Sequence, residues 1–284
     1  MTSDNTSSSQ APFSLAGKTA IVTGGGRGIG KAIVASLTLA GANVLATDID
    51  RETLEQMQLS VCHPERVALV CGDLMDPAHP QQIVDAALET FQSIDILVNC
   101  AGFSWDSVIQ KTSDEQFLAM LNIHIVAPFR LLRAASGYIR ATAKREIAAG
   151  ERVMRKVVNI TSIAATDGNA GQAGYSSGKA GVIGLTKTLA KEWGRYNVNV
   201  NAVGFGLIET RMTAPLKPGG SIRMAGKEVP IGVQPALLDS VASNCPLGRM
   251  GTPEEAAGAV LFFCSPLSDY VTGETLICGG GYHF

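Results

Sequence analysis

The chain has 284 residues, of which 46% are hydrophobic and 17% charged, and its formal net charge is -2. This composition is sufficient for a large buried core and excludes a disordered chain. Because the charges are balanced and no basic stretch is present, nucleic acid is not an expected partner. No uninterrupted apolar run of about 18 residues occurs, so we also expect no membrane span.

The six cysteines are scattered and form no Cys-x-x-Cys pair. This spacing predicts reduced thiols in a cytoplasmic protein and no metal site. The polar, serine-rich start lacks the apolar stretch of a signal peptide. We therefore expect residues 1–13 to be a disordered tail and residues 14–284 to form a single domain.

Short apolar runs alternate with helical patterns along the rest of the chain. Strands are predicted at 18–23, 43–47, 67–70, 94–98, 156–160, 198–202 and 274–278, and helices at 28–39, 51–59, 79–91, 114–145, 174–194 and 253–263. This alternation indicates an α/β fold whose parallel sheet is covered by helices on both faces. Pro128 is expected to bend the longest helix, and the charged segment 144–155 to extend a helix into solvent.

Residues 207–245 interrupt this alternation. The segment is rich in proline and glycine and follows the carboxyl end of a predicted strand. Loops of this length are usually functional. We therefore expect it to form a lid over a site.

A glycine-rich turn, TGGGRGIG at 23–30, joins the first strand to the first helix. Glycines there permit positive φ and let the backbone approach a pyrophosphate, while the helix amino end offers free N–H groups. A tight turn without a ligand has similar needs. Asp48 makes the cofactor interpretation stronger, because it ends the second strand 18 residues after Gly30. A carboxylate at that place can accept hydrogen bonds from adenosine ribose.

Asp48 favours NAD over NADP as the cofactor, since a 2′-phosphate would meet a like charge. Arg27 is the counter-argument, because a guanidinium in the glycine turn can pair with that phosphate. Asp48 is also compatible with helix capping, a role for which Asp50 is better placed. We therefore expect NAD.

Tyr175 and Lys179 lie four residues apart on one predicted helix, and hence on one face. We expect the ammonium to lower the pKa of the phenol, so that Tyr175 can exchange a proton with an alcohol as a hydride moves. Ser162 follows the fifth strand, at the same sheet edge as the glycine turn, where its hydroxyl can donate to a carbonyl oxygen. Singly, each residue is also compatible with a helix surface or a turn.

Together these motifs resemble the short-chain dehydrogenases/reductases from about Leu15 to Tyr282. The resemblance rests on TGGGRGIG, NCAG at 99–102, Asn122, Ser162, YSSGK at 175–179 and LGRMGTPEE at 247–255. It implies a seven-stranded Rossmann sheet in the order 3-2-1-4-5-6-7 and a homotetramer. The chain departs from the family at Phe205, where proline is usual, and at Cys100, where asparagine is common.

The resemblance also implies roles for single residues. The catalytic tetrad is matched by Asn122, Ser162, Tyr175 and Lys179. In the family the tyrosine is the acid/base, the lysine lowers its pKa and holds the nicotinamide ribose, the serine orients the substrate oxygen, and the asparagine links the lysine to a proton relay through water. The positions that match cofactor contacts are Gly24, Arg27, Gly28, Ile29, Gly30, Asp48, Asp73, Leu74, Asn99, Ala101, Gly102, Tyr175, Lys179, Ile208 and Thr210.

Three aromatic side chains lie near these motifs. His124 lies two residues from Asn122 and is expected on another face of the helix, as a packed or interface histidine. Phe103 and Trp105 follow the NCAG motif and are equally compatible with a substrate pocket and with loop anchors.

Three functions are consistent with the sequence. The first is an NAD-dependent oxidoreductase that interconverts a small secondary alcohol and a ketone, with Tyr175 as acid/base. The second is a 3-oxoacyl-thioester reductase that uses NADPH. The lid cations Lys217, Arg223 and Lys227 are candidates to meet its acidic carrier, although solvated lid charges are the favoured interpretation of them. The third is a nucleotide-binding sensor without turnover, which the intact catalytic set disfavours.

Overall fold

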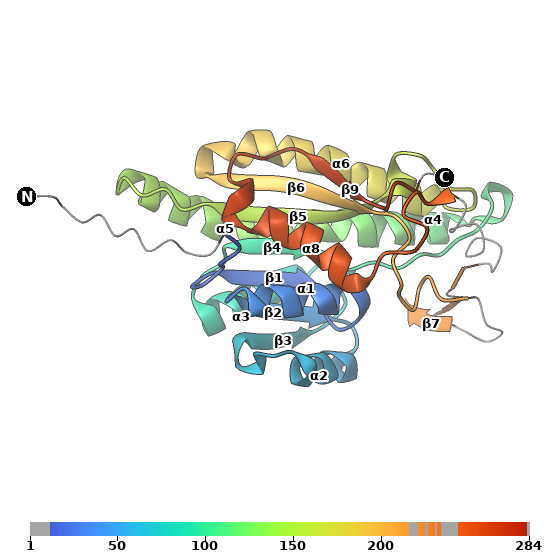
Figure 1. The fold of residues 1–284 in the computed structure, drawn as a ribbon, viewed down its shortest axis with the longest axis horizontal. Coiled ribbons are helices and arrows are strands. Elements are labelled where there is room, and N and C mark those ends of the chain that lie inside the picture. Colours follow the sequence, from blue (N-terminus) through green and yellow to red (C-terminus); the bar gives the residue numbers. More distant parts are fainter. Residues whose placement is uncertain (1–11, 216–220, 225–226, 231, 234–243, 283–284) are drawn as a thin grey trace, which may run out of the picture.

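The computed structural model describes residues 12–215, 221–224, 227–230, 232–233 and 244–282. Within them, seven parallel strands form one sheet in the order β3-β2-β1-β4-β5-β6-β9 (Figure 1). The strands are β1 (Thr19–Thr23), β2 (Asn43–Asp48), β3 (Val67–Cys71), β4 (Ile96–Asn99), β5 (Arg155–Ser162), β6 (Val198–Phe205) and β9 (Thr275–Cys278). This confirms the predicted Rossmann order. From β1 the strands are added first toward one edge of the sheet and then, from β4 on, toward the other edge. The predicted tail lies mainly in residues 1–11, outside the described residues.

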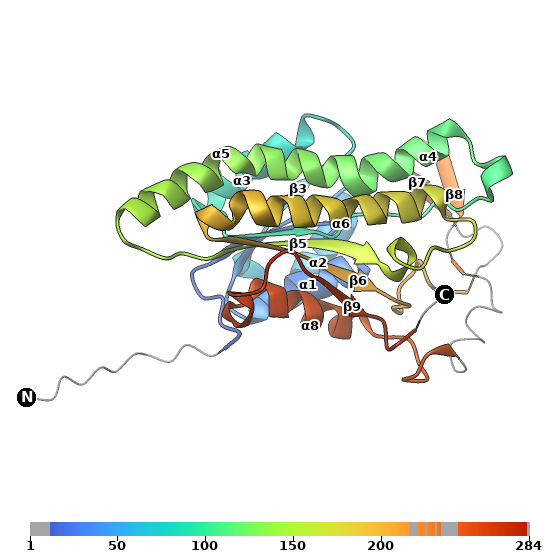
Figure 2. The same ribbon diagram turned by 90° about the horizontal axis from the view of Figure 1, so that it is seen from above.

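Helices cover both faces of the sheet. One face carries α1 (Gly28–Leu39), α2 (Arg51–Ser60) and α8 (Pro253–Cys264), and the other carries α3 (His79–Phe91), α4 (Asp114–Leu121), α5 (Ala127–Ala148) and α6 (Ala173–Trp193). Figure 2 shows α5 and α6 side by side, across the sheet from α1 and α8. Short helical turns are η1 (Pro64–Arg66), η2 (Ile109–Lys111), η3 (Asn122–Val126), η4 (Ile163–Ala165), η5 (Gly194–Tyr196) and η6 (Pro266–Ser268).

The central strands are buried on both faces because their side chains alternate between two cores. In β1, Ala20 and Val22 pack under α1 and α8, whereas Ile21 packs against the helices of the opposite face. This explains why the strand sequences are continuous apolar runs without polar alternation.

The long predicted helix is continuous from Asp114 to Ala148 but contains one π turn, η3. Pro128 is the second residue of α5 and directly follows this π turn, so its missing N–H falls where the hydrogen-bond pattern of the helix changes. By length and composition alone this helix could cross a membrane, a property that it shares with core helices of soluble proteins. Here α5 packs against α3, and α4 packs against α6. The irregularity that the sequence assigns to Pro128 is therefore the wider turn just before it.

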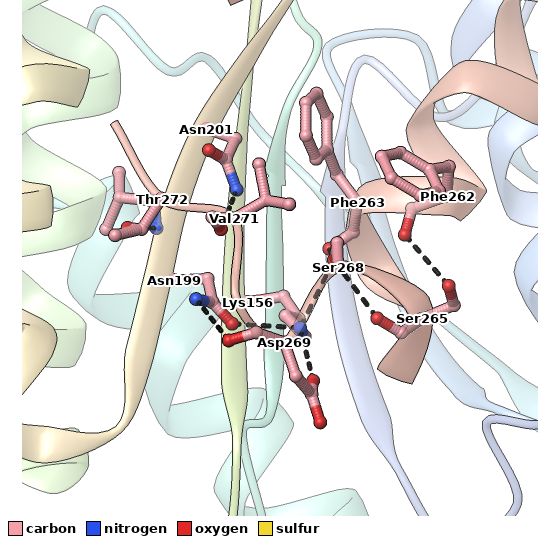
Figure 3. Close-up of polar contacts among 11 residues, drawn as sticks. Lys156, Asn199, Asn201, Phe262, Phe263, Ser265, Ser268, Asp269, Val271 and Thr272 are labelled. Atoms are coloured by element: carbon pink, nitrogen blue, oxygen red, sulfur yellow. Dashed lines mark hydrogen bonds and ion pairs between the residues drawn. The ribbon is translucent and has the colours of Figure 1, made fainter. Parts of the chain in front are cut away.

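A buried polar network ties the amino ends of β5 and β6 to the segment after α8 (Figure 3). The Lys156 ammonium donates to Asn199 Oδ1 at 2.9 Å, Ser268 Oγ at 3.2 Å and Asp269 Oδ1 at 2.6 Å. Because every hydrogen of the ammonium has an oxygen partner, this lysine can be 4% exposed without an unpaired charge.

The prediction that residues 144–155 extend a helix into solvent is wrong at its end. Helix α5 stops at Ala148, and Arg155 is buried at the start of β5. Its guanidinium pairs with both carboxylate oxygens of Glu146, each at 2.7 Å. This bidentate pair compensates the desolvation of the Arg155 charge, so the charged segment can be buried at its end.

The segment 207–245, which interrupts the predicted alternation, has regular structure of its own. It contains an antiparallel hairpin of β7 (Ser221–Met224) and β8 (Lys227–Pro230). Residues 216–220, 225–226, 231 and 234–243 lie outside the described residues, and Lys217 is among them. The lid therefore stays a prediction.

Candidate active site

The glycine turn packs tightly against itself and against the end of β4. A side chain on Gly30 would collide with the carbonyl oxygen of Gly24. Gly24 itself has a φ of +66°, a backbone conformation that favours glycine. A Cβ on Gly24 would lie 2.7 Å from the Ala101 Cα. Helix α1 then begins without a side-chain cap and without an acidic residue in its first turn. Its amino end therefore presents main-chain N–H groups that suit a phosphate.

The carboxyl end of β2 lies beside this turn. Asp48 Oδ2 accepts a hydrogen bond from the Gly26 N–H at 3.1 Å. Arg27 points instead to Asp50, whose Oδ2 lies 2.5 Å from the guanidinium, and to the Thr53 hydroxyl at 3.1 Å. Asp50 also caps α2 by accepting from the Thr53 N–H. The capping role thus belongs to Asp50, and Asp48 is held at the edge of the glycine turn.

Residues of the NCAG motif connect the ends of β1 and β4 with β5 beside the glycine turn. The Thr23 hydroxyl accepts from the N–H groups of Cys100 and Ala101, at 3.0 and 3.1 Å. Asn99 is buried and donates to Asn159 at 2.8 Å, so its amide ties β4 to β5. The motif therefore fixes the sheet edge through main-chain and amide contacts.

The remaining predicted cofactor positions surround the same edge. Asp73 follows β3 and accepts from the Met75 N–H at 2.8 Å, while Leu74 is buried among the residues under α3 and α5. On the other side, the Thr210 methyl group would be 3.6 Å from a Cβ on Gly28. Ile208 is paired with Gly251 in an isolated bridge. The structure thus brings the segment after β6 over the glycine turn, while Ile29 packs partly buried beneath it.

Ser162, Tyr175 and Lys179 meet at the carboxyl edge of the sheet. Ser162 ends β5, and α6 returns along β5 so that Tyr175 and Lys179 face it. The Lys179 Nζ lies 5.8 Å from the centre of the Tyr175 ring and donates to the Ile160 carbonyl oxygen at 2.8 Å. The Thr161 hydroxyl anchors α6 by donating to the Lys179 carbonyl at 2.8 Å. The three side chains that the sequence predicts to cooperate are therefore adjacent.

The charges of this group differ from the sequence prediction. Burial raises the pKa of Tyr175 to about 12; a hydrogen bond with Ser162 opposes this rise, and Asp106 and Cys100 add to it. Burial also lowers the pKa of Lys179 to about 8. The Tyr175 pKa is therefore raised and not lowered as predicted: desolvation of the phenolate is the largest cause, and Lys179 is not among the causes of the shift.

The structure does not bring Asn122 to this group. Its side chain is exposed, and among the described residues no hydrogen bond reaches it. His124 is the residue of η3 that turns inward: it is 2% exposed, and its ring meets the Tyr175 ring edge-on at 4.9 Å and 83°. Asn122 is thus not where the resemblance implies, whereas the prediction of a packed His124 on another face of the helix is confirmed, and only its contact with Tyr175 is not foreseen. The reason is the π turn, which rotates residues relative to an α-helix.

Phe103 and Phe205 have structural places, whereas both interpretations of Trp105 stay open. Phe103 is fully buried and anchors its loop, whereas Trp105 is only partly buried against the same core. Phe205 is buried opposite Ser162 at the end of β6, and its carbonyl lies 3.5 Å from the Ser162 hydroxyl. Among the described residues, no group of His, Cys, Asp and Glu side chains is arranged to hold a metal.

Known proteins are similar to this chain over nearly its whole length. Residues 24–283 match a family described as enoyl-(acyl carrier protein) reductase. The 3-oxoacyl-(acyl-carrier-protein) reductase FabG of Vibrio cholerae is 34% identical over 282 residues, covering 95% of this chain and 99% of that protein. The FabG of Aquifex aeolicus is 35% identical over 269 residues, covering 94% and 98%.

A solved structure gives the same picture. The glucose/ribitol dehydrogenase, a short-chain dehydrogenase/reductase from Brucella melitensis, is 28% identical and has a TM-score of 0.79. The match covers 96% of this chain and 100% of that chain. With the family match, the sheet order and the adjacent Ser162, Tyr175 and Lys179, this shows that the chain belongs to the short-chain dehydrogenase/reductase family of oxidoreductases.

Proposed function

We propose that the protein reduces the ketone of a 3-oxoacyl thioester to a secondary alcohol, with NADH as the hydride donor and Tyr175 as the proton donor. The observation that carries this proposal is the Tyr175 phenol, partly buried between Ser162, Lys179 and His124 at the carboxyl edge of the sheet. Substrates of doubly wound sheets bind at that edge. The relatives support the reaction type, since they are named 3-oxoacyl-(acyl-carrier-protein) reductase and glucose/ribitol dehydrogenase.

The residues around the glycine turn fit a dinucleotide. The uncapped amino end of α1 supplies donors for a diphosphate, and Gly24, Gly28 and Gly30 keep side chains away from it. The Asp48 carboxylate supplies acceptors for ribose hydroxyls. A bound nicotinamide provides the hydride of the reaction.

Asp48 supports NADH rather than NADPH. Its carboxylate lies at the mouth of the turn, on the Gly26 N–H, where a 2′-phosphate would meet a like charge. Arg27, which argues for NADPH in the sequence, is paired with Asp50 and Thr53. The negative charge of Asp50 thus partly neutralises the guanidinium that would have to attract a 2′-phosphate.

The protonation state of Tyr175 supports reduction. With its pKa raised to about 12, the phenol keeps its proton near neutral pH and is ready to give it to a ketone oxygen. Ser162 donates to the same oxygen as negative charge develops on it. Lys179, with its pKa lowered to about 8, is a neighbouring group that can return a proton to the phenolate or stabilise it.

The substrate class is supported by the relatives. The FabG proteins of Vibrio cholerae and Aquifex aeolicus are named as 3-oxoacyl-(acyl-carrier-protein) reductases and align along almost their whole length. A second candidate is the oxidation of a small secondary alcohol with NAD, which the Asp48 carboxylate favours. Both functions use the same residues, and they differ in substrate and in the favoured direction.

An assay of the purified protein tests the proposal. Acetoacetyl-coenzyme A is supplied with NADH or NADPH, and the nicotinamide absorbance is followed beside a panel of ketones and secondary alcohols. We expect turnover of the thioester with NADH preferred. Preference for NADPH contradicts the role of Asp48, and turnover of simple alcohols alone favours the second candidate. Absence of turnover with every substrate contradicts the enzymatic proposal and favours a nucleotide sensor.

A further inference from the structure

His124 occupies the centre of the site. Its Nε2 lies 2.7 Å from the Phe103 carbonyl oxygen, and its ring edge contacts Tyr175. A carbonyl oxygen can only accept, so Nε2 carries the hydrogen of the neutral ring. Nδ1 is then an acceptor with a free lone pair, and it is buried without a hydrogen-bond partner among the described residues. A buried acceptor without a partner is costly and rare.

Two glycines of the sequence motifs make room for this ring. A Cβ on Gly102 would lie 2.5 Å from the His124 Cε1 and 2.9 Å from Nδ1. A Cβ on Gly178 would lie 2.9 Å from the His124 Cβ. Gly102 belongs to the NCAG motif and Gly178 stands next to Lys179. The imidazole is thus enclosed by the segments that build the site, and its Nδ1 edge faces Gly102.

We propose that His124, and not Asn122, is the fourth residue of the active site: a positioning residue whose ring orients the Tyr175 phenol and whose Nδ1 accepts a hydrogen bond beside the Tyr175–Lys179 pair. This rests on the proposed function of Tyr175. The π turn η3 is what aims the ring at Tyr175 and leaves Asn122 exposed. A widened helical turn at such a site is typical of a functional constraint.

The charges around the ring keep it neutral. Burial and the nearby Lys179 ammonium hold the pKa of His124 well below its usual value, while the hydrogen bond to Phe103 opposes this. The groups that face Tyr175 are Ser162 from β5, Lys179 from α6, Asp106 and Cys100 after β4, and His124 from η3. Removing the polar imidazole leaves the phenolate in a more apolar site, which raises the pKa of Tyr175 further.

Two substitutions separate the acceptor from the ring. His124→Phe keeps an aromatic ring against Tyr175 but removes Nδ1, and His124→Asn keeps a polar acceptor in a smaller side chain. With acetoacetyl-coenzyme A and NADH, we expect His124→Phe to lower kcat roughly tenfold to a hundredfold with KM nearly unchanged. We expect His124→Asn to recover most of kcat. In the reverse reaction, from 3-hydroxybutyryl-coenzyme A and NAD, the acid limb of the pH profile should move to higher pH in His124→Phe.

Thermal unfolding and NADH binding show whether each variant is folded, and Asn122→Ala is the competing variant. The proposal is overturned if folded His124→Phe keeps the kcat and pH profile of the wild type, or if Asn122→Ala loses activity while both His124 variants retain it. Should His124→Phe fail to fold, His124→Leu takes its place, because it also removes Nδ1 and is smaller than phenylalanine; full kcat in the folded His124→Leu variant overturns the proposal. Tyr175→Phe is measured in parallel, because full activity there contradicts the proposed function itself.

Discussion

Two lysines are buried against the same sheet, one near each end of its strands. Lys156, at the amino end of β5, is 4% exposed, and its three partners include the Asp269 carboxylate. Lys179, at the carboxyl end, is 5% exposed, and the hydrogen bond described for its ammonium goes to one carbonyl oxygen. The first is solvated by protein and has a structural role. The second is left with unused donors beside Tyr175, which is what proton transfer or ribose binding requires.

The largest expected effect distinguishes these lysines by activity. Lys179→Met should lower kcat for acetoacetyl-coenzyme A by roughly a hundredfold or more, because the phenolate loses the adjacent ammonium. Lys156→Met, the matched control, should keep kcat within about twofold, because its network lies at the other end of β5. Steady-state kinetics of both variants checks this. Equal losses of kcat in the two folded variants would show that the two ends of the sheet do not differ in role.

Cofactor choice is expected to change when the carboxylate beside the glycine turn is removed. Asp48→Ser should increase the ratio of kcat/KM with NADPH to that with NADH by roughly tenfold to a hundredfold, because the like charge near a 2′-phosphate is lost. Glu52→Gln, in the exposed first turn of α2, is the control for a general change in charge. A ratio that stays constant in Asp48→Ser contradicts the role given to this carboxylate.

The same two lysines should differ in the opposite sense in stability. Lys156→Met leaves Asp269, Asn199 and Ser268 without their donor, and we expect the free energy of unfolding to fall by about 2 kcal/mol, since Asp269 is 42% exposed and partly solvated. Lys179→Met replaces a desolvated charge with an apolar chain and should cost little or even stabilise. Urea unfolding measures both. The interpretation fails if Lys179→Met is the more destabilising variant.

The smallest expected effect is pH-dependent and concerns the Arg155–Glu146 pair at the amino end. The guanidinium lowers the pKa of Glu146 from 4.5, so its contribution is complete above that value and is lost as the pH falls through the lowered pKa. Glu146→Gln should therefore destabilise by about 1 kcal/mol at neutral pH, with the difference shrinking in acid. Unfolding at several pH values, with exposed Glu151→Gln as control, tests the sign. A difference that grows in acid contradicts it.

The sequence predicts most of the fold because strands and helices here obey simple periodicities. All seven sheet strands and their order are confirmed, and Gly24, Gly30 and Asp48 lie together as their spacing indicates. Two buried cations are missed for a shared reason. Arg155 and Lys156 carry charged side chains, a type that is usually exposed. They are buried because each pairs with a carboxylate from another part of the chain, Glu146 for Arg155 and Asp269 for Lys156.

The site is predicted less completely, for two physical reasons. The prediction for Asn122 assumes the residue positions of an α-helix, and the π turn turns His124 inward instead. The prediction for the Tyr175 pKa considers only the neighbouring charge of Lys179. The pKa is set mainly by desolvation, and the burial that causes it cannot be inferred from the spacing of two residues in the sequence. The homotetramer, the cytoplasmic location and the lid stay predictions.

Replacing one oxygen tests the central claim most directly. Tyr175→Phe keeps the ring that packs on His124 and removes only the hydroxyl that is proposed to donate the proton. Turnover of acetoacetyl-coenzyme A with NADH should fall by roughly a thousandfold, while NADH binding stays within about twofold. Near-normal turnover by the folded variant would contradict the account, because no other described group is then assigned the proton.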